Sequence, residues 1–227
     1  MFSYMRNNPE TWHKNFWPQV IKQSGKTYAL IWLLLVWTAF TGKHKTVVIC
    51  VLSLLLTLAT VTAIKETVGR ARPRNVIKAE TKAEEDHFFH SHSFPSGDTA
   101  SVFAAGTVLA FAVPWPVTIG FAACCCGVGF LRVVEMAHYP SDVFAGAALG
   151  ILCGWLANKI AEKKPQIEHI LRGLERKISI IGVIIIPIIM WLSQGPDNFK
   201  IFLKFYFPAA IVMLLAGRWL MNRQSAR

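Results

Sequence analysis

Seven apolar stretches, each near the length of a membrane helix, constrain this chain more than any other feature. A helix needs about 20 residues to cross the hydrocarbon layer, and about 17 is a practical lower limit. The stretches lie at about 28–41, 46–64, 97–113, 117–134, 141–160, 178–193 and 201–221. The second, fourth, fifth and seventh are long enough, whereas the first and sixth are short. We therefore predict an all-α fold, a polytopic membrane helical bundle of six to seven transmembrane helices.

The composition excludes a soluble globular enzyme. Hydrophobic residues make up 53% of the 227 residues and charged residues only 16%, with a mean hydropathy of +0.40. In an average soluble chain about a quarter of the residues are charged. The formal net charge of +11 falls in the few polar stretches. We expect those stretches to meet anions, either phospholipid head groups in general or one phosphorylated ligand.

The pattern divides the chain into three parts. Residues 1–27 form an amphipathic, interfacial segment in which aromatic and aliphatic residues recur every four positions. Residues 28–221 form the integral-membrane domain, and residues 222–227 form a basic tail. Within the domain, residues 158–177 alternate in charge, which predicts a solvated helix at the interface.

The five cysteines all lie inside apolar stretches, at Cys50, Cys124, Cys125, Cys126 and Cys153. Their number is odd, and no spacing among them is typical of a zinc site. We interpret them as buried small hydrophobic residues rather than as a disulfide framework.

Three polar segments contain residues that can carry chemistry. The first follows the second apolar stretch and places Lys65, Arg70, Arg72 and Arg74 within ten residues. Taken alone, this segment is typical of a head-group anchor at the end of a membrane helix.

The second segment, Phe94–Thr99, opens the third apolar stretch. Ser96, Gly97, Asp98 and Thr99 supply capping chemistry and free backbone amides at a helix N-terminus, where an anion is favoured. Taken alone, it is an ordinary capped start of a helix.

The third segment, Arg132–Asp142, joins the fourth and fifth apolar stretches. Asp142 follows His138 by four residues, in the first turn of the next helix. Its carboxylate can accept a hydrogen bond from one imidazole nitrogen and leave the other nitrogen as a nucleophile. His138 alone would more often be a structural loop histidine, but the pairing indicates a mechanism.

The number of membrane crossings between these segments predicts which face of the membrane each one lies on. A chain that crosses the membrane twice between two points returns to the same face. The first two segments lie between the second and third stretches, and the third segment lies two crossings later. All three segments are therefore predicted to share one face of the membrane.

The three segments resemble the three-part signature of the type 2 phosphatidic acid phosphatase (PAP2) superfamily, the acid phosphatase and haloperoxidase-like group. The residues that carry the resemblance are Lys65, Arg72-Pro73, Pro95-Ser96-Gly97, Arg132, His138 and Asp142. They occur in order over residues 65–142. The resemblance implies a helical bundle that dephosphorylates lipid phosphates through a phosphohistidine intermediate, with no metal and no other cofactor.

The resemblance also implies a role for each matching residue. The phosphoryl oxygens would be bound by Lys65, Arg72 and Arg132 and by the amides near Ser96 and Gly97. His138 would be the nucleophile, and Asp142 would orient it. The imidazole attack and the later hydrolysis divide one high barrier into two lower ones.

The chain departs from the family pattern at two positions. Leu131 stands where the family usually has a serine, which removes one hydrogen bond to phosphate. Asp98 stands where most members have a histidine that protonates the leaving alcohol. An aspartic acid can donate that proton at neutral pH only if a phosphate dianion or desolvation favours its neutral form. The rival donors are His87, His90 and His92, and the aspartate variant resembles the lipid A phosphatase subtype.

We expect an integral-membrane enzyme that cleaves a phosphomonoester or pyrophosphate of a bacterial envelope lipid such as lipid A, undecaprenyl diphosphate or phosphatidylglycerophosphate. Its partners would be that lipid and the bilayer, with no nucleic acid. The family resemblance implies an inner-membrane protein whose site faces the periplasm. A lipid phosphotransferase and a noncatalytic lipid-phosphate-binding protein stay open as alternatives, and a histidine-rich metal transporter is a weaker one.

Overall fold

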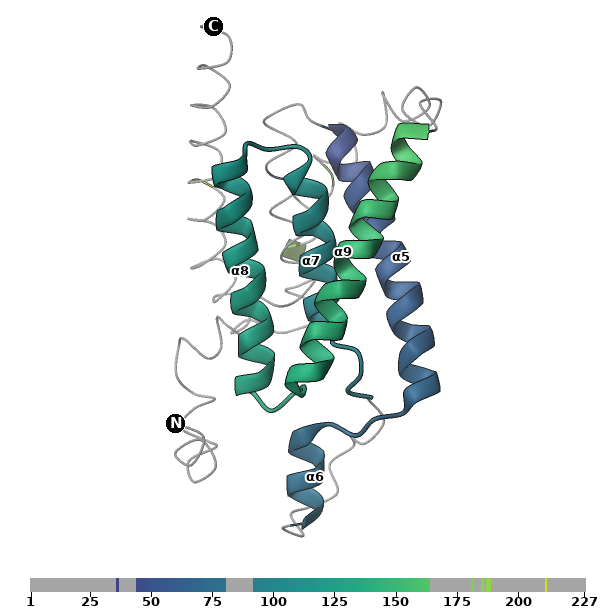
Figure 1. Ribbon diagram of the computed structural model, residues 1–227, viewed down its shortest axis with the longest axis vertical. Helices are drawn as coiled ribbons and strands as arrows, with labels where there is room; N and C mark the ends of the chain where they lie inside the picture. The colour runs from purple at the N-terminus through teal and green to yellow at the C-terminus, as the bar shows by residue number, and fades with distance from the viewer. Residues whose placement is uncertain are drawn as a thin grey trace, which may run out of the picture. The chain divides into compact units, whose positions relative to one another are not determined.

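The computed structural model describes residues 44–80 and 92–163, together with positions 36, 181, 185, 187, 188 and 211. The two continuous ranges form five helices and contain no strand: α5 (His44–Val68), α6 (Pro73–Glu80), α7 (Gly97–Ala110), α8 (Trp115–Val134) and α9 (Pro140–Lys163). Figure 1 shows α5, α7, α8 and α9 running alongside one another, with α6 beyond one end. The prediction of an all-α bundle is confirmed for this part of the chain.

Three stretches within the described ranges are long and apolar enough to cross a membrane: Lys45–Val76, Trp115–Val134 and Pro140–Lys163. α7 is shorter than the apolar stretch at 97–113 predicts, because it ends at Ala110, shortly before Pro114 opens the next helix. Its 14 residues span about 21 Å at 1.5 Å per residue, less than the hydrocarbon core of about 30 Å.

Several predictions fall on residues outside the described ranges. These are the interfacial segment 1–27, the basic tail 222–227 and the helices expected at 28–41, 178–193 and 201–221. The count of six to seven transmembrane helices therefore stays a prediction. The predicted start of the interfacial helix at 158–177 is wrong, because residues 158–163 belong to α9.

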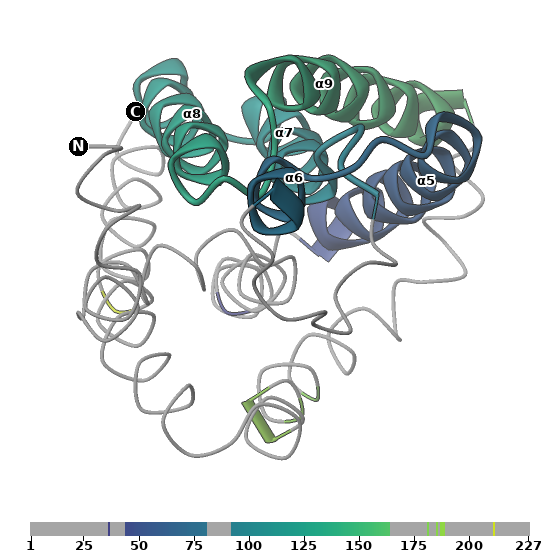
Figure 2. The same cartoon turned by 90° about the horizontal axis from the view of Figure 1, so that it is seen from below.

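The short helix α7 lies between the other long helices. Seen along the bundle in Figure 2, it has α8 on one side and α5 and α9 on the other. The Cys125 thiol of α8 donates a hydrogen bond to the Val102 carbonyl of α7 at 3.3 Å. On another side, a methyl group added at Gly97 would lie 3.5 Å from the Val61 side chain of α5. Small residues on α7 allow three neighbours to approach it.

Glycines on α9 set its distance from α7. A Cβ atom added at Gly146 would lie 2.5 Å from the carbonyl oxygen of the residue that caps α7, and one added at Gly150 or Gly154 would lie 2.2 or 2.7 Å from a carbonyl oxygen of α7 itself. The three glycines recur every four residues and so lie on one face of the helix. Small residues at this spacing let membrane helices pack backbone against backbone. This contact fixes the start of α9 against the start of α7.

The outer surfaces of the helices are apolar. Trp115 and Phe130 of α8, Phe144 of α9 and Leu58 of α5 are 74%, 65%, 75% and 64% exposed. Exposed large apolar side chains of this kind suit a lipid-facing surface. All five cysteines are free, but Cys124 and Cys126 are exposed, so the expectation that every cysteine is buried is wrong for these two. They flank Cys125, which is buried.

We predict that Gly150→Ala destabilises the protein and that Gly127→Ala does not. The added methyl group at Gly150 would meet the Ala100 carbonyl oxygen at 2.2 Å, whereas nothing lies within 4 Å of a Cβ atom at Gly127. Both changes raise helix propensity, so only packing separates them. The expected loss at Gly150 is about 1–3 kcal/mol, measured as unfolding free energy in detergent micelles. Equal stability of the two variants would contradict the close α7–α9 contact.

Candidate active site

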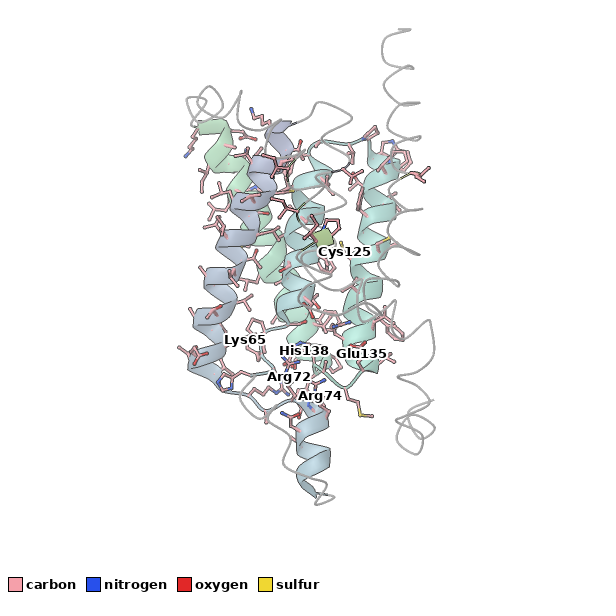
Figure 3. The ribbon with its side chains drawn as sticks, turned by 180° about the vertical axis from the view of Figure 1, so that it is seen from behind. Lys65, Arg72, Arg74, Cys125, Glu135 and His138 are labelled. Carbon is pink, nitrogen blue, oxygen red and sulfur yellow. The ribbon has the colours of Figure 1, made fainter. Side chains whose placement is uncertain are left out.

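The structure brings the three polar segments to one end of the bundle, as the number of membrane crossings predicts. The Ser96 amide donates to the Asp142 carbonyl at 3.0 Å, which joins the second segment to the third. The Arg74 amide donates to the Met136 carbonyl at 3.1 Å, which joins the first to the third. Figure 3 shows the side chains of Lys65, Arg72, Arg74, Glu135 and His138 gathered there.

A tight turn between α8 and α9 places His138. Met136 adopts a left-handed conformation with φ +52, and the Met136 amide donates to the Val133 carbonyl at 3.0 Å. The Ala137 amide donates to the Arg132 carbonyl at 3.1 Å, which completes the bonding pattern of a Schellman cap. The His138 amide donates to the same carbonyl at 3.3 Å. The turn therefore ties the backbone of His138 to Arg132.

The His138 imidazole is buried, with 3% of its surface exposed. Its Nδ1 lies 2.7 Å from the Ser93 carbonyl oxygen and 3.8 Å from Asp142 Oδ2. The hydrogen bond expected between His138 and Asp142 is therefore not formed, and the Ser93 carbonyl takes its place. The reason is that the Asp142 carboxylate is already held by other donors.

Ser93 determines the tautomer of His138. A carbonyl oxygen can only accept, so the proton of the neutral ring lies on Nδ1 and the lone pair lies on Nε2. Burial, and next the charge of Arg72, lower the pKa of His138 to about 4, against the opposing effects of Ser93 and Asp142. The ring is therefore neutral near pH 7, with Nε2 free of a proton. A neutral imidazole is the form that can act as a nucleophile.

Asp142 is fully buried in the first turn of α9. One of its oxygens, Oδ1, accepts from Arg70 Nη1 at 2.8 Å. The other, Oδ2, accepts from the Tyr139 amide at 2.9 Å and from the Ser93 hydroxyl. A buried carboxylate requires such partners.

Arg132 is buried and lies between two carboxylates. Its Nη1 is 3.1 Å from Asp98 Oδ2, and its Nη2 is 3.1 Å from Glu135 Oε2. The Asp98 side chain is 35% exposed, whereas that of Arg132 is 7% exposed. Asp98 is the candidate general acid, and Arg132 is expected to bind phosphate. Of the two side chains, that of Asp98 is the more accessible to solvent.

Lys65 and Arg72 are half-buried at the same end of the bundle. Lys65 lies in the last turn of α5, and its ammonium group donates to the His92 carbonyl at 2.8 Å. Gly69 ends the helix with φ +60, and its amide donates to the Lys65 carbonyl at 3.0 Å. This cap turns the chain, so that Arg72 follows in the loop before α6.

Ser96 is the N-cap of α7, and its side chain accepts from the Thr99 amide at 3.5 Å. Because the Ser96 amide bonds to Asp142, it is not available to a phosphate. Gly97 and Asp98 are the first two residues of α7. Their amides have no hydrogen-bond acceptor within the helix, because no helical carbonyl precedes them by one turn. Of the amides expected to bind an anion near Ser96 and Gly97, that of Gly97 therefore stays a candidate, and that of Asp98 lies beside it.

The sequence pattern places neither Ser93 nor Arg70 in the site. Ser93 lies three residues before Ser96 in a stretch of polar residues, and nothing in the pattern singles it out. Arg70 stands in the sequence only as one member of a basic run. Among the rival proton donors, His92 is described and half-buried, whereas His87 and His90 lie outside the described residues. Within the described ranges, no three His, Cys, Asp or Glu side chains are grouped to hold a metal ion.

Comparisons with known proteins give a consistent result. The lipid A 1-phosphatase of Rhizobium etli is 38% identical to the chain over 109 residues, covering 41% of this chain and 40% of that protein. The lipid A 1-phosphatase of Porphyromonas gingivalis is 33% identical over 106 residues, which cover 45% of this chain and 21% of that protein. The chain thus spans less than half the length of these relatives.

A crystal structure of Aquifex aeolicus LpxE is similar with a TM-score of 0.50 and 29% identity, covering 61% of this chain and 81% of that one. The family model of the PAP2 superfamily matches residues 46–166, just over half of the chain. These residues include all three polar segments and the helices that hold them. The chain belongs to the PAP2 superfamily.

Proposed function

We propose that the chain is a membrane phosphatase that removes a phosphate group from a lipid through a phosphohistidine at His138. One observation carries the proposal. The buried, neutral imidazole has its proton fixed on Nδ1 by Ser93, so the Nε2 lone pair is available at the end of the bundle where the cations gather. A buried histidine that served only packing would need no cations around it.

Lys65, Arg72 and Arg132 are proposed to hold the phosphoryl oxygens. In phosphoryl transfer, negative charge spreads over three equatorial oxygens, and fixed cations and helix-end amides stabilise that charge. The amides of Gly97 and Asp98 lie at the start of α7, where the helix favours an anion. The Leu131 side chain cannot donate a hydrogen bond to phosphate. The phosphoryl oxygens would therefore be held by the charged side chains and the backbone amides.

The proposed reaction has two steps. Nε2 of His138 attacks phosphorus and forms a P–N bond while the P–O bond to the lipid breaks. The leaving alkoxide takes a proton from Asp98. Water then attacks the phosphohistidine, the P–N bond breaks, and Asp98 accepts a proton from the water. In both steps the Nδ1 proton stays bonded to the Ser93 carbonyl.

Arg132 suggests how Asp98 could be prepared for that role. Asp98 and Arg132 form an ion pair at 3.1 Å. A phosphate dianion that binds Arg132 competes with the Asp98 carboxylate for the same guanidinium. Once the dianion lies beside it, the like charge favours the protonated form of Asp98. His92 is the nearest alternative donor in the sequence.

The proposed substrate is a bacterial envelope lipid, with lipid A foremost. The relatives named lipid A 1-phosphatase support this choice, as does the aspartate at position 98. The exposed apolar faces of α8 and α9 suit a substrate whose tails stay in the bilayer. We further propose an inner-membrane location with the site on the periplasmic side. Transfer of the phosphoryl group to a second lipid instead of water is the alternative reaction.

The test is a panel of lipids offered to purified protein in detergent micelles. Lipid A, undecaprenyl diphosphate, phosphatidylglycerophosphate and phosphatidate would each be incubated with the protein, with and without EDTA. We expect phosphate release from at least one lipid, unaffected by EDTA, and none from the folded His138→Asn variant. Equal release by the variant, or release that needs added metal, would contradict the proposal. Transfer to a second lipid without free phosphate would support the alternative.

We predict that Asp98→Asn slows cleavage of a lipid phosphate by about 10²-fold or more, because an alkoxide leaving group needs a proton. The same change should have little effect on p-nitrophenyl phosphate, whose leaving group needs none. Rates on the two substrates, measured side by side, provide the test. Equal losses on both would mean that Asp98 serves the phosphate site through Arg132 and is not the acid.

A further inference from the structure

The guanidinium of Arg132 binds two carboxylates that come from different helices. Nη1 lies 3.1 Å from Asp98 Oδ2 in the first turn of α7, and Nη2 lies 3.1 Å from Glu135 Oε2 at the end of α8. The side chains of Arg132, Glu135 and Asp98 are 7%, 17% and 35% exposed. Arg132 is therefore shared between a more buried partner on its own helix and a more accessible partner on a neighbouring helix.

The backbone holds Glu135 in a fixed place beside Arg132. Glu135 is the C-cap of α8, and its amide donates to the Leu131 carbonyl at 2.9 Å. It directly precedes Met136, the residue in the left-handed conformation that turns the chain toward His138. A negative charge at the C-terminus of a helix is disfavoured by the helix dipole. The position of Glu135 therefore does not help α8 to form, and the carboxylate has its partner in Arg132.

Asp98 lies among the cations that are expected to hold phosphate. Besides its ion pair with Arg132, it interacts electrostatically with Lys65 and Arg72. A phosphate dianion bound to these three cations would take the place of the Asp98 carboxylate. Nothing in that exchange requires the contact between Nη2 and Glu135 to break.

We propose that Glu135 is a positioning residue that holds Nη2 of Arg132 throughout the reaction, while Nη1 exchanges Asp98 for the phosphate. This inference rests on the proposed role of Arg132 as a phosphate ligand. Arginine and a carboxylate often pair through two parallel hydrogen bonds. Without Glu135, the guanidinium could turn and give both terminal nitrogens to Asp98. The phosphate would then compete with a stronger ion pair.

Loss of Glu135 also has an opposite effect, because it removes a negative charge near the phosphate. A charge that only repelled the anion would strengthen phosphate binding when it is removed. A positioning carboxylate would weaken phosphate binding when it is removed, and only while Asp98 can take its place on Arg132. The two roles therefore predict opposite signs.

The first experiment measures the binding of inorganic phosphate to purified protein in detergent micelles by isothermal titration calorimetry near pH 7. We expect Glu135→Met to weaken binding by about tenfold. Glu135→Gln should weaken it less, because the amide oxygen can still accept from Nη2. Glu162→Met should have no effect, since it removes the exposed carboxylate of a Lys159–Glu162 pair with the same spacing. Unchanged or stronger binding by folded Glu135→Met would overturn the proposal.

A double-mutant cycle tests whether Glu135 acts by keeping Arg132 from Asp98. In the Asp98→Asn background, where the charged competitor is gone, Glu135→Met should weaken phosphate binding by less than about twofold. An equal loss in both backgrounds would overturn the proposal, because a merely structural defect does not depend on Asp98. If Glu135→Met does not fold, the same cycle is run with Glu135→Gln. A loss that is equal in both backgrounds would again overturn the proposal.

NMR of protein with ¹⁵N-labelled arginine follows the two terminal nitrogens directly. The Arg132 signals would be assigned by their absence in Arg132→Lys. We expect added phosphate to shift the Nη1 signals and to leave the Nη2 signals in place, and to shift both in Glu135→Met. If phosphate shifts the Nη2 signals of the unchanged protein as much as those of Nη1, Glu135 does not hold Nη2 and the proposal is overturned.

Activity separates this inference from the proposed function. On a lipid that the unchanged protein cleaves, Glu135→Met should lower kcat/KM by about tenfold, and Glu162→Met should not. Cleavage that folded Glu135→Met carries out at an unchanged kcat/KM would overturn the inference and leave the proposed function standing. The expected phosphate binding and NMR shifts in a protein that cleaves no lipid would count against the proposed function alone.

Discussion

The hydrogen bond from His138 Nδ1 to the Ser93 carbonyl, 2.7 Å long, is the interaction on which the site depends. It fixes the proton on one nitrogen and so leaves the lone pair on the other. Burial and the charge of Arg72 then keep the ring neutral. If the ring turned or took a second proton, the cations around it would surround a group that cannot attack phosphorus. The other contacts of the site preserve this arrangement.

Helix packing supplies the geometry for that hydrogen bond. Ser93 lies just before α7, and His138 lies just before α9, so the bond forms only if the two helices begin close together. The glycines at 146, 150 and 154 allow that approach, since any side chain there would meet the backbone of α7. The Ser96 amide and the Asp142 carbonyl join the two helix starts directly at 3.0 Å. Packing in the apolar part of the bundle and chemistry at its end are therefore coupled.

The sequence predicts much of this arrangement, because hydrophobic stretches and motif spacing are local patterns. The helices at 46–64, 117–134 and 141–160 and the meeting of the three polar segments follow from such patterns. The partner of His138 does not. Asp142 stands at the right spacing, but Arg70, Ser93 and the Tyr139 amide compete for its oxygens, and that competition depends on tertiary contacts. The early end of α7 at Ala110 and the exposure of Cys124 and Cys126 likewise depend on packing.

In the mechanism that we propose, Nε2 of His138 carries the phosphoryl group during turnover. The most direct measurement is to quench the reaction with ³²P-labelled lipid in alkali within milliseconds and to identify the modified atom by peptide mapping and by ³¹P NMR of the phosphohistidine. We expect a phosphoryl group on Nε2 of His138, formed and lost at rates no slower than turnover. A phosphoryl group on Nδ1, on another residue, or on no residue while turnover proceeds would contradict it.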